Sequence, residues 1–118
     1  MKILMSIKPF YADQIFQGKK KYEYRRRIFK RRDVSSLVIY ESAPVSLIVG
    51  EAKIQKILSG PINEIWERTG RDGGITLEAF KEYFKGCDSG YAIELCDAAL
   101  YSQPMSIPSR PPQSFMYI

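Results

Sequence analysis

The chain has 118 residues, enough for one domain with a real hydrophobic core and too few for two. Hydrophobic residues make up 45% of it, which argues against intrinsic disorder, and the formal net charge is +5. It contains no histidine, which excludes a histidine general base, a Ser-His-Asp triad and most zinc sites. We therefore expect a single domain over residues 1–118.

The sequence also argues against a metal or cofactor site and against a secreted or membrane-spanning protein. Cys87 and Cys96 have no ligand partners at metal spacing, so we expect no metal and no cofactor. The first ten residues contain no signal-peptide pattern, and no later run approaches 18 apolar residues. We expect a cytoplasmic protein without a membrane partner; its oligomeric state is not predicted.

The positive charge is concentrated at the start of the chain. Residues 1–32 carry eleven basic and two acidic groups, net +9, whereas residues 33–118 carry seven basic and eleven acidic groups, net −4. A polarised basic face is typical of proteins that bind a phosphate-bearing partner, so RNA or DNA is the favoured partner. A solubilising surface without a partner is the alternative interpretation.

The predicted elements begin with a strand over Lys2–Ile7. A helix follows, started by Pro9 and ended by Gly18. Alternating apolar and polar residues then predict a strand over Tyr22–Phe29, and a buried strand is expected over Ser36–Tyr40.

The second half of the chain begins with a long β-rich segment, Val45–Leu58, in which Gly50 predicts a bend of the kind that closes small barrels. Two short helices follow, one from Pro61 to Gly70 and one from Thr76 to Gly86, and two strands complete the chain at Tyr91–Leu95 and Ser114–Ile118. About six strands and three short helices indicate the α+β class, as a small barrel with peripheral helices.

Basic side chains are densest just after the first helix. Nine Lys and Arg residues lie between positions 19 and 32, with Glu23 as the one acid among them. In the predicted strand, Glu23 and Arg25 share a face. Lys20 has the wrong parity for that face, and it joins them only if a bulge or turn intervenes or if the strand begins after it.

Several motifs together resemble one protein family. Gly18, Lys20, Glu23 and Arg25 fit the pattern Gly-x-Lys-x-x-Glu-x-Arg, which is similar to the signature of the ASCH domain, a member of the PUA-like β-barrel superfamily. Five other stretches resemble a bacterial and phage branch of that family, often described as transcriptional regulators: Ser6-Ile7-Lys8-Pro9, Tyr40-x-Ser42-x-Pro44, Val49-Gly50-Glu51, Gly90-Tyr91-Ala92-Ile93 and Pro111-Pro112-Gln113-Ser114-Phe115.

The resemblance implies a barrel of five or six strands with a cleft between helix and sheet that holds nucleic acid or a modified nucleotide. Some family members are enzymes, and one small group hydrolyses the amide of N4-acetylcytidine with a lysine, a threonine and a glutamate. Lys20 corresponds to that lysine. Glu23 stands at the threonine position, however, and the segment aligned with the glutamate reads Asp72-Gly73-Gly74, without a glutamate. Another member is a ribonuclease.

The candidate binding residues are those of the motif, the following basic run and the quoted stretches: Ser6, Lys8, Lys20, Glu23, Arg25, Arg26, Arg27, Arg31, Tyr40, Ser42 and Gln113. Glu23 is suited to accept a hydrogen bond from the amino group of a base, and Lys20 to contact a carbonyl or phosphate. The arginines are suited to the nucleic-acid backbone. The structural alternative is an ion pair that only satisfies a strand end, beside a mobile basic loop.

Three functions remain open, and the leading one is recognition of RNA or of a modified nucleotide in a basic cleft, in a regulatory role. The second is an enzyme, either an amidohydrolase of a modified nucleoside or a ribonuclease, with Lys20 and Glu23 as the catalytic pair. The third is a domain whose basic face binds an acidic protein. A carboxylate beside Lys20 favours its ammonium form, so we expect a raised lysine pKa, which favours binding over catalysis.

Overall fold

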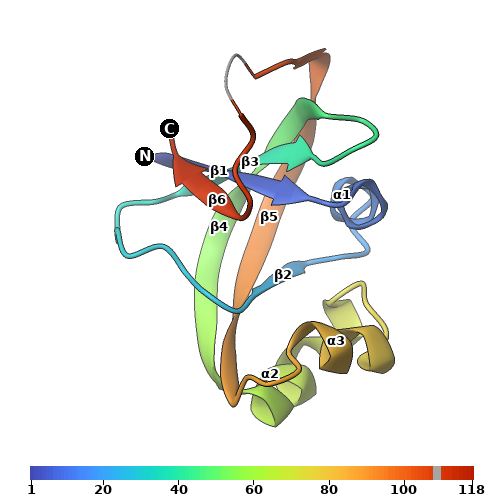
Figure 1. Cartoon of the computed structure of the whole chain (residues 1–118), viewed down its shortest axis with the longest axis vertical. Helices are drawn as coiled ribbons and strands as arrows, with labels where there is room; N and C mark the ends of the chain where they lie inside the picture. The colour runs from blue at the N-terminus through green and yellow to red at the C-terminus, as the bar shows by residue number, and fades with distance from the viewer. Residues whose placement is uncertain (108–109) are drawn as a thin grey trace.

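The computed structural model describes residues 1–107 and 110–118 (Figure 1). The described residues form six strands, namely β1 (Lys2–Ile7), β2 (Tyr22–Arg25), β3 (Ser36–Glu41), β4 (Leu47–Pro61), β5 (Ser89–Met105) and β6 (Phe115–Tyr117). The helices are α1 (Pro9–Phe16), α2 (Ile62–Thr69), the short 3₁₀-helix η1 (Gly70–Asp72) and α3 (Leu77–Tyr83). None of the helices in the described residues is long and apolar enough to cross a membrane.

All six strands belong to one curled sheet with the order β2-β5-β4-β3-β1-β6. The β1–β3 pair is parallel and the other neighbours are antiparallel. The long strands β4 and β5 form the back of the half-barrel, and α2 and α3 lie at their lower end (Figure 1). The α+β small barrel with peripheral helices that the sequence predicts is confirmed.

Gly50 lies where the β4 register shifts against both neighbouring strands, as the predicted bend requires. A Cβ atom at this position would lie 2.8 Å from the Phe16 ring and would collide with the main-chain oxygen of Ala99. A glycine therefore lets α1 pack directly against the bent sheet.

Two predicted strands have the wrong length. The strand expected over Tyr22–Phe29 ends at Arg25, because the chain bends at Arg26 and Arg27 and leaves the edge of β5. The strand expected over Tyr91–Leu95 extends to Met105. It contains a bulge around Asp97, which has φ 51°, and a bulge interrupts the period-two pattern by which strands are predicted.

The ends of the other predicted helices and strands agree with the structure within a few residues. The long segment predicted over Val45–Leu58 is β4, and Pro61 caps α2 instead of lying inside it. The predicted cap of the third helix is confirmed, since the Thr76 hydroxyl accepts a hydrogen bond from the Ala79 N–H at 3.1 Å.

The hydrophobic core has two main parts. The larger part packs the sheet against α1, and the smaller part attaches α2 and α3 through Tyr24, Ile65, Phe80, Phe84 and Ala92. The Tyr24 ring lies edge-on to Phe80, with centroids 5.0 Å apart. Because Tyr24 is in β2, this contact fixes the strand of the candidate motif against α3.

Candidate functional site

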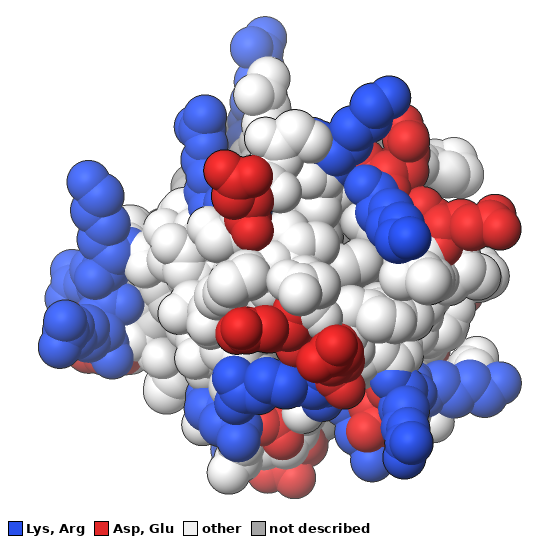
Figure 2. All heavy atoms as spheres, turned by 90° about the horizontal axis from the view of Figure 1, so that it is seen from below, with Lys and Arg blue, Asp and Glu red and all other residues white. Residues whose placement is uncertain are grey.

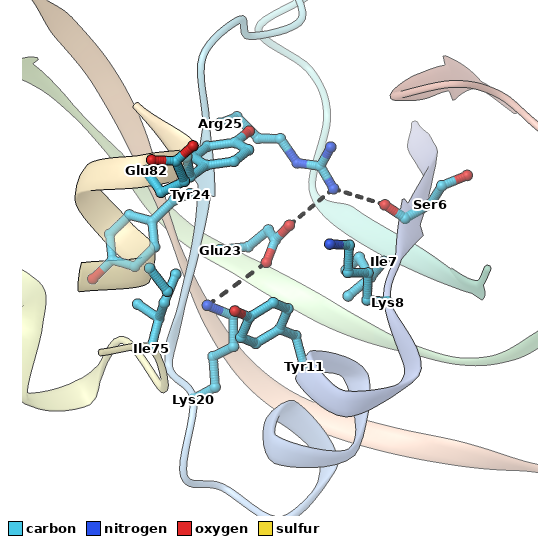
Figure 3. A pocket seen from close by; sticks show the side chains of 12 residues that line it. Ser6, Ile7, Lys8, Tyr11, Lys20, Glu23, Tyr24, Arg25, Ile75 and Glu82 are labelled. Carbon is cyan, nitrogen blue, oxygen red and sulfur yellow. Dashed lines mark hydrogen bonds and ion pairs between the residues drawn. The ribbon is translucent and has the colours of Figure 1, made fainter. Parts of the chain in front are cut away.

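A cavity of about 390 Å³ lies beside β2, lined also by residues of α1 and α3 (Figure 3). Its volume is in the range of small-molecule sites in proteins. Lysine, arginine, glutamate and tyrosine side chains dominate the lining, which consists of Ser6, Ile7, Lys8, Tyr11, Lys20, Glu23, Tyr24, Arg25, Ile75, Ala79, Glu82 and Tyr83.

The end of α1 directs Lys20 into this cavity. Gly18 has φ 79°, and the N–H groups of Lys19 and Lys20 both donate to the Gln14 oxygen, at 2.9 and 3.1 Å. The chain is therefore folded back under the helix before β2 begins at Tyr22. Of the arrangements that the sequence leaves open, the structure has the one in which the strand starts after Lys20.

The Lys20 ammonium is enclosed by acceptors and aromatic rings. Its side chain is 3% exposed, and Nζ donates to the Gly73 oxygen at 2.6 Å. Nζ also lies 3.8 Å from Glu23 Oε1, 4.9 Å from the Tyr24 ring centroid and 5.2 Å from that of Tyr11. These contacts hold the buried charge in one position, because ring faces and carbonyl oxygens both attract a cation.

The pKa of Lys20 is lowered, which makes the sequence-based expectation of a raised pKa wrong. Burial is the largest cause, because it disfavours the charged ammonium. The carboxylate of Glu23 acts in the opposite direction and Arg25 lowers the pKa further. Glu23 has less effect than expected since it lies 2.8 Å from Arg25 and 3.8 Å from Lys20, so its charge is shared.

Arg25 is held by groups from three parts of the fold. Its Nη2 donates to Glu23 Oε2 at 2.8 Å and to the main-chain oxygen of Ser6 at 2.9 Å. Its Nη1 donates to Ser114 Oγ over a longer distance, 3.4 Å. Ser6 Oγ in turn donates to the Pro112 oxygen at 2.7 Å. Figure 3 shows Arg25 between Glu23 and Ser6, with Lys20 on the other side of the carboxylate.

Tyr24 belongs both to the core and to the cavity wall. Thr69 donates its hydroxyl hydrogen to the Ile65 oxygen at 2.6 Å, so Tyr24 is the donor in its 2.7 Å hydrogen bond to Thr69. Burial raises the pKa of Tyr24, and the hydroxyl therefore stays protonated. Tyr24 is thus a buried core residue that also contacts the Lys20 ammonium with its ring.

A second cavity, of about 690 Å³, adjoins the first at Arg25 and Tyr83 and is also lined by Arg26, Arg27, Cys87, Gln113 and Ser114. The Arg26 guanidinium lies over the Tyr83 ring at 4.9 Å. On the face of the molecule seen in Figure 2 the charge is mixed, since Asp and Glu side chains lie between several of the projecting Lys and Arg side chains.

The structure brings most of the predicted site residues to these two cavities. Ser6, Lys8, Lys20, Glu23 and Arg25 line the first, and Arg25 lines the second together with Arg26, Arg27 and Gln113.

Three predicted residues lie elsewhere. Arg31 pairs with Asp33 at 2.8 Å on the surface. Tyr40 is 5% exposed and belongs to a separate cluster of the core. Ser42 lies in the turn after β3, where its N–H donates to the Ile7 oxygen at 3.0 Å.

Sequence reasoning missed the contributions of α1 and α3. Tyr11, Glu82 and Tyr83 line the first cavity, and the Gly73 oxygen is the acceptor closest to Lys20. Tyr11 and Tyr83 look like ordinary helix residues, and a main-chain acceptor leaves no trace in a sequence. Across residues 1–107 and 110–118, no group of three or more His, Cys, Asp or Glu side chains could hold a metal ion.

Comparison with known proteins identifies the family. Residues 5–101 match the family described as the ASCH domain. The chain belongs to this family. An "ASCH domain-containing ribonuclease" from Zymomonas mobilis is 33% identical over 94 residues, which are 80% of this chain and 64% of that protein. The chain thus spans less than two thirds of this curated relative.

Solved structures agree with the family assignment. The crystal structure of ASCH from Zymomonas mobilis superposes with a TM-score of 0.91 at 29% identity, covering 99% of this chain and 87% of that one. The PUA-like half-barrel is therefore the fold of the ASCH domain in this chain.

A second curated relative has lower identity. The large ribosomal subunit protein uL22 of Ureaplasma parvum is 22% identical over 120 residues, which are 98% of this chain and 39% of that protein.

Proposed function

We propose that this ASCH domain binds RNA and holds one nucleotide in the cavity that contains Lys20, Glu23 and Arg25. The observation that carries the proposal is the buried Lys20–Glu23–Arg25 array, which presents donors and an acceptor inside a cavity with tyrosines on its walls. The name of the Zymomonas relative, a ribonuclease of this family, supports RNA over other polyanions.

The array suits the polar edge of a base. Glu23 accepts hydrogen bonds, whereas Lys20 and Arg25 donate them, so a base with adjacent amino and carbonyl groups finds complementary partners. Lys8 adds a cation for a phosphate oxygen, and the rings of Tyr11 and Tyr83 offer stacking surfaces. Stacking of a base on an aromatic ring contributes about 1–3 kcal/mol.

RNA cleavage is a second candidate function, favoured by the lowered pKa of Lys20 and by the ribonuclease relative. In such a reaction a neutral Lys20 amine takes the proton of a 2′-hydroxyl, and the 2′-oxygen attacks the neighbouring phosphorus. The bond from phosphorus to the 5′-oxygen breaks, and that oxygen takes a proton from the Lys8 ammonium or from water. The products are a 2′,3′-cyclic phosphate and a free 5′-hydroxyl.

Binding is tested by fluorescence anisotropy of a labelled single-stranded RNA hexamer, in buffer containing EDTA, with wild type, Lys20→Met and Glu23→Gln. We expect the wild type to bind the RNA and each variant to bind it with an affinity about tenfold or more lower. Each substitution removes a charge that strengthens a hydrogen bond to the RNA. Lys53→Ala is the control, since Lys53 is exposed on β4 and pairs only loosely with Asp97, at 3.6 Å. Absence of RNA binding by the wild-type protein would refute the proposal and favour an acidic protein partner.

The same samples distinguish binding from catalysis. Gel analysis of the RNA after incubation shows whether fragments with cyclic-phosphate ends accumulate, and their loss in Lys20→Met would establish the ribonuclease. A parallel incubation with N4-acetylcytidine follows cytidine release by chromatography. We expect no release in proportion to enzyme, because Glu23 occupies the position of the hydroxyl residue that the amidohydrolases use.

A further inference from the structure

The second cavity suggests how a longer ligand is bound. We propose that it is a subsite for the next nucleotide of a single-stranded RNA, so that the ligand is a chain of at least two linked nucleotides and not a free nucleoside. This inference rests on the proposed function, and it adds the class of ligand. Arg25 and Tyr83 line both cavities, so a linking phosphate at this shared wall would join a nucleotide in each.

The charge of the second cavity differs from that of the first. The first contains Glu23 and Glu82 among its cations, whereas the described residues that line the second include three arginines and no acid. In the described part of the chain, the arginine–carboxylate ion pairs are those of Arg25 and Arg31, so Arg26 and Arg27 keep their full charge for a ligand. Unpaired guanidinium groups in a concave surface favour a phosphate.

Two of the arginines are already placed for this role. The Tyr83 ring holds Arg26 at 4.9 Å, which restricts the side chain while it leaves the guanidinium edge free to donate. Arg25 donates to Ser114 over 3.4 Å, and a phosphate oxygen would replace this long contact with a shorter, charge-assisted one. Gln113 in the same lining provides an amide for a base edge or a sugar.

The experiment compares ligands of different length by calorimetry. Ribonucleoside monophosphates, dinucleotides and a mixed-sequence RNA hexamer are titrated into wild type and into the double variant Arg26→Ala with Arg27→Ala, and gels check that the RNA stays intact. Both arginines are exposed, so the variant is expected to fold, which circular dichroism verifies. The matched control is Arg68→Ala with Arg71→Ala, which removes the same charge from exposed positions outside both cavities.

We expect the wild type to bind the hexamer at least tenfold more tightly than a monophosphate. The Arg26 and Arg27 variant should lose most of this gain and keep its monophosphate affinity within about twofold. Its slope of log K against log salt should fall by about 1.4, since each phosphate contact of a single strand contributes about 0.7. The Arg68 and Arg71 control should keep the wild-type preference for the hexamer over the monophosphate.

Three results would overturn the inference. Equal wild-type affinity for monophosphate and hexamer would leave the proposed RNA binding intact and remove the second subsite, as would an undiminished gain in the Arg26 and Arg27 variant. Failure of the wild type to bind RNA of any length would instead refute the proposed function together with the inference.

Discussion

Arg25 Nη2 donates a hydrogen bond to the main-chain oxygen of Ser6 at 2.9 Å, across the open side of the half-barrel. Arg25 is in β2, one edge of the sheet, whereas Ser6 is in β1, next to the other edge strand, β6. Within residues 1–107 and 110–118 no backbone hydrogen bond joins these two edges, and the guanidinium connects them. The side chain that lines both cavities therefore also sets the distance between the ends of the sheet.

Arg25→Ala should destabilise the fold as well as abolish RNA binding. The change removes the 2.8 Å partner of the Glu23 carboxylate, which is 10% exposed, and leaves it with the Lys20 ammonium at 3.8 Å; breaking a buried ion pair in this way costs about 3 kcal/mol. Urea denaturation measures the loss. The control is Arg31→Ala, which breaks a pair of the same 2.8 Å length whose side chains are 51% and 57% exposed, and it should cost less than about 1 kcal/mol. Equal losses would show that Arg25 does not close the barrel.

Gly74→Ala should displace Lys20. Gly74 has φ 64°, and a Cβ atom there would lie 2.6 Å from Lys20 Cβ. Gly18 has a similar φ, 79°, and open space around its Cβ position, so Gly18→Ala is the matched control. Both variants should lose about 1–2 kcal/mol of stability from backbone strain, and only Gly74→Ala should also lose RNA affinity in the anisotropy assay. Equal affinities would contradict the importance of the Lys20 position.

Thr69→Val should leave the buried Tyr24 hydroxyl without an acceptor. In the structure the Tyr24 hydroxyl donates a hydrogen bond to Thr69 Oγ1 at 2.7 Å. A buried donor that loses its acceptor lowers the free energy of unfolding by about 1–3 kcal/mol. Adding Tyr24→Phe removes that donor, so the double variant should be more stable than Thr69→Val alone. Thermal unfolding of the two single variants and the double variant tests this, and additive losses would count against the hydrogen bond.

The local features of the fold were predictable from the sequence because they depend on neighbouring residues. The stop of α1 at Gly18 and the Thr76 cap follow from local backbone chemistry, and the strands over Lys2–Ile7 and Ser36–Tyr40 follow from apolar runs. The length of β5 did not follow, since a bulge at Asp97 shifts the pattern by one residue.

The site was predictable in the segment that carries the motif and, through the family resemblance, at Ser6, Lys8 and Gln113. Lys20, Glu23 and Arg25 meet within six residues of chain. Tyr83 and the Gly73 oxygen reach them through tertiary packing, and no pattern in the sequence links such distant positions. The direction of the Lys20 pKa shift was also unpredictable, because it depends on the degree of burial as well as on the neighbouring charge.

The lowered pKa of Lys20 makes stability depend on pH in a specific direction. The unfolded lysine keeps its proton up to a pKa of about 10.5, whereas the folded one loses it at lower pH. Between the two values the unfolded state binds more protons, so the free energy of unfolding rises with pH. Below the folded pKa the cost of burying the charge is constant.

We therefore expect the free energy of unfolding of wild type, minus that of Lys20→Met, to increase with pH up to about 10.5. Urea denaturation at a series of pH values from 7 upward measures this difference. Burial raises the pKa of Tyr24, which reduces stability above pH 10, but this effect is present in both proteins and cancels. A difference that stays flat or falls would show that Lys20 is not desolvated. If the protein cleaves RNA with Lys20 as the base, the cleavage rate should rise over the same pH range, because the same deprotonation produces the active amine.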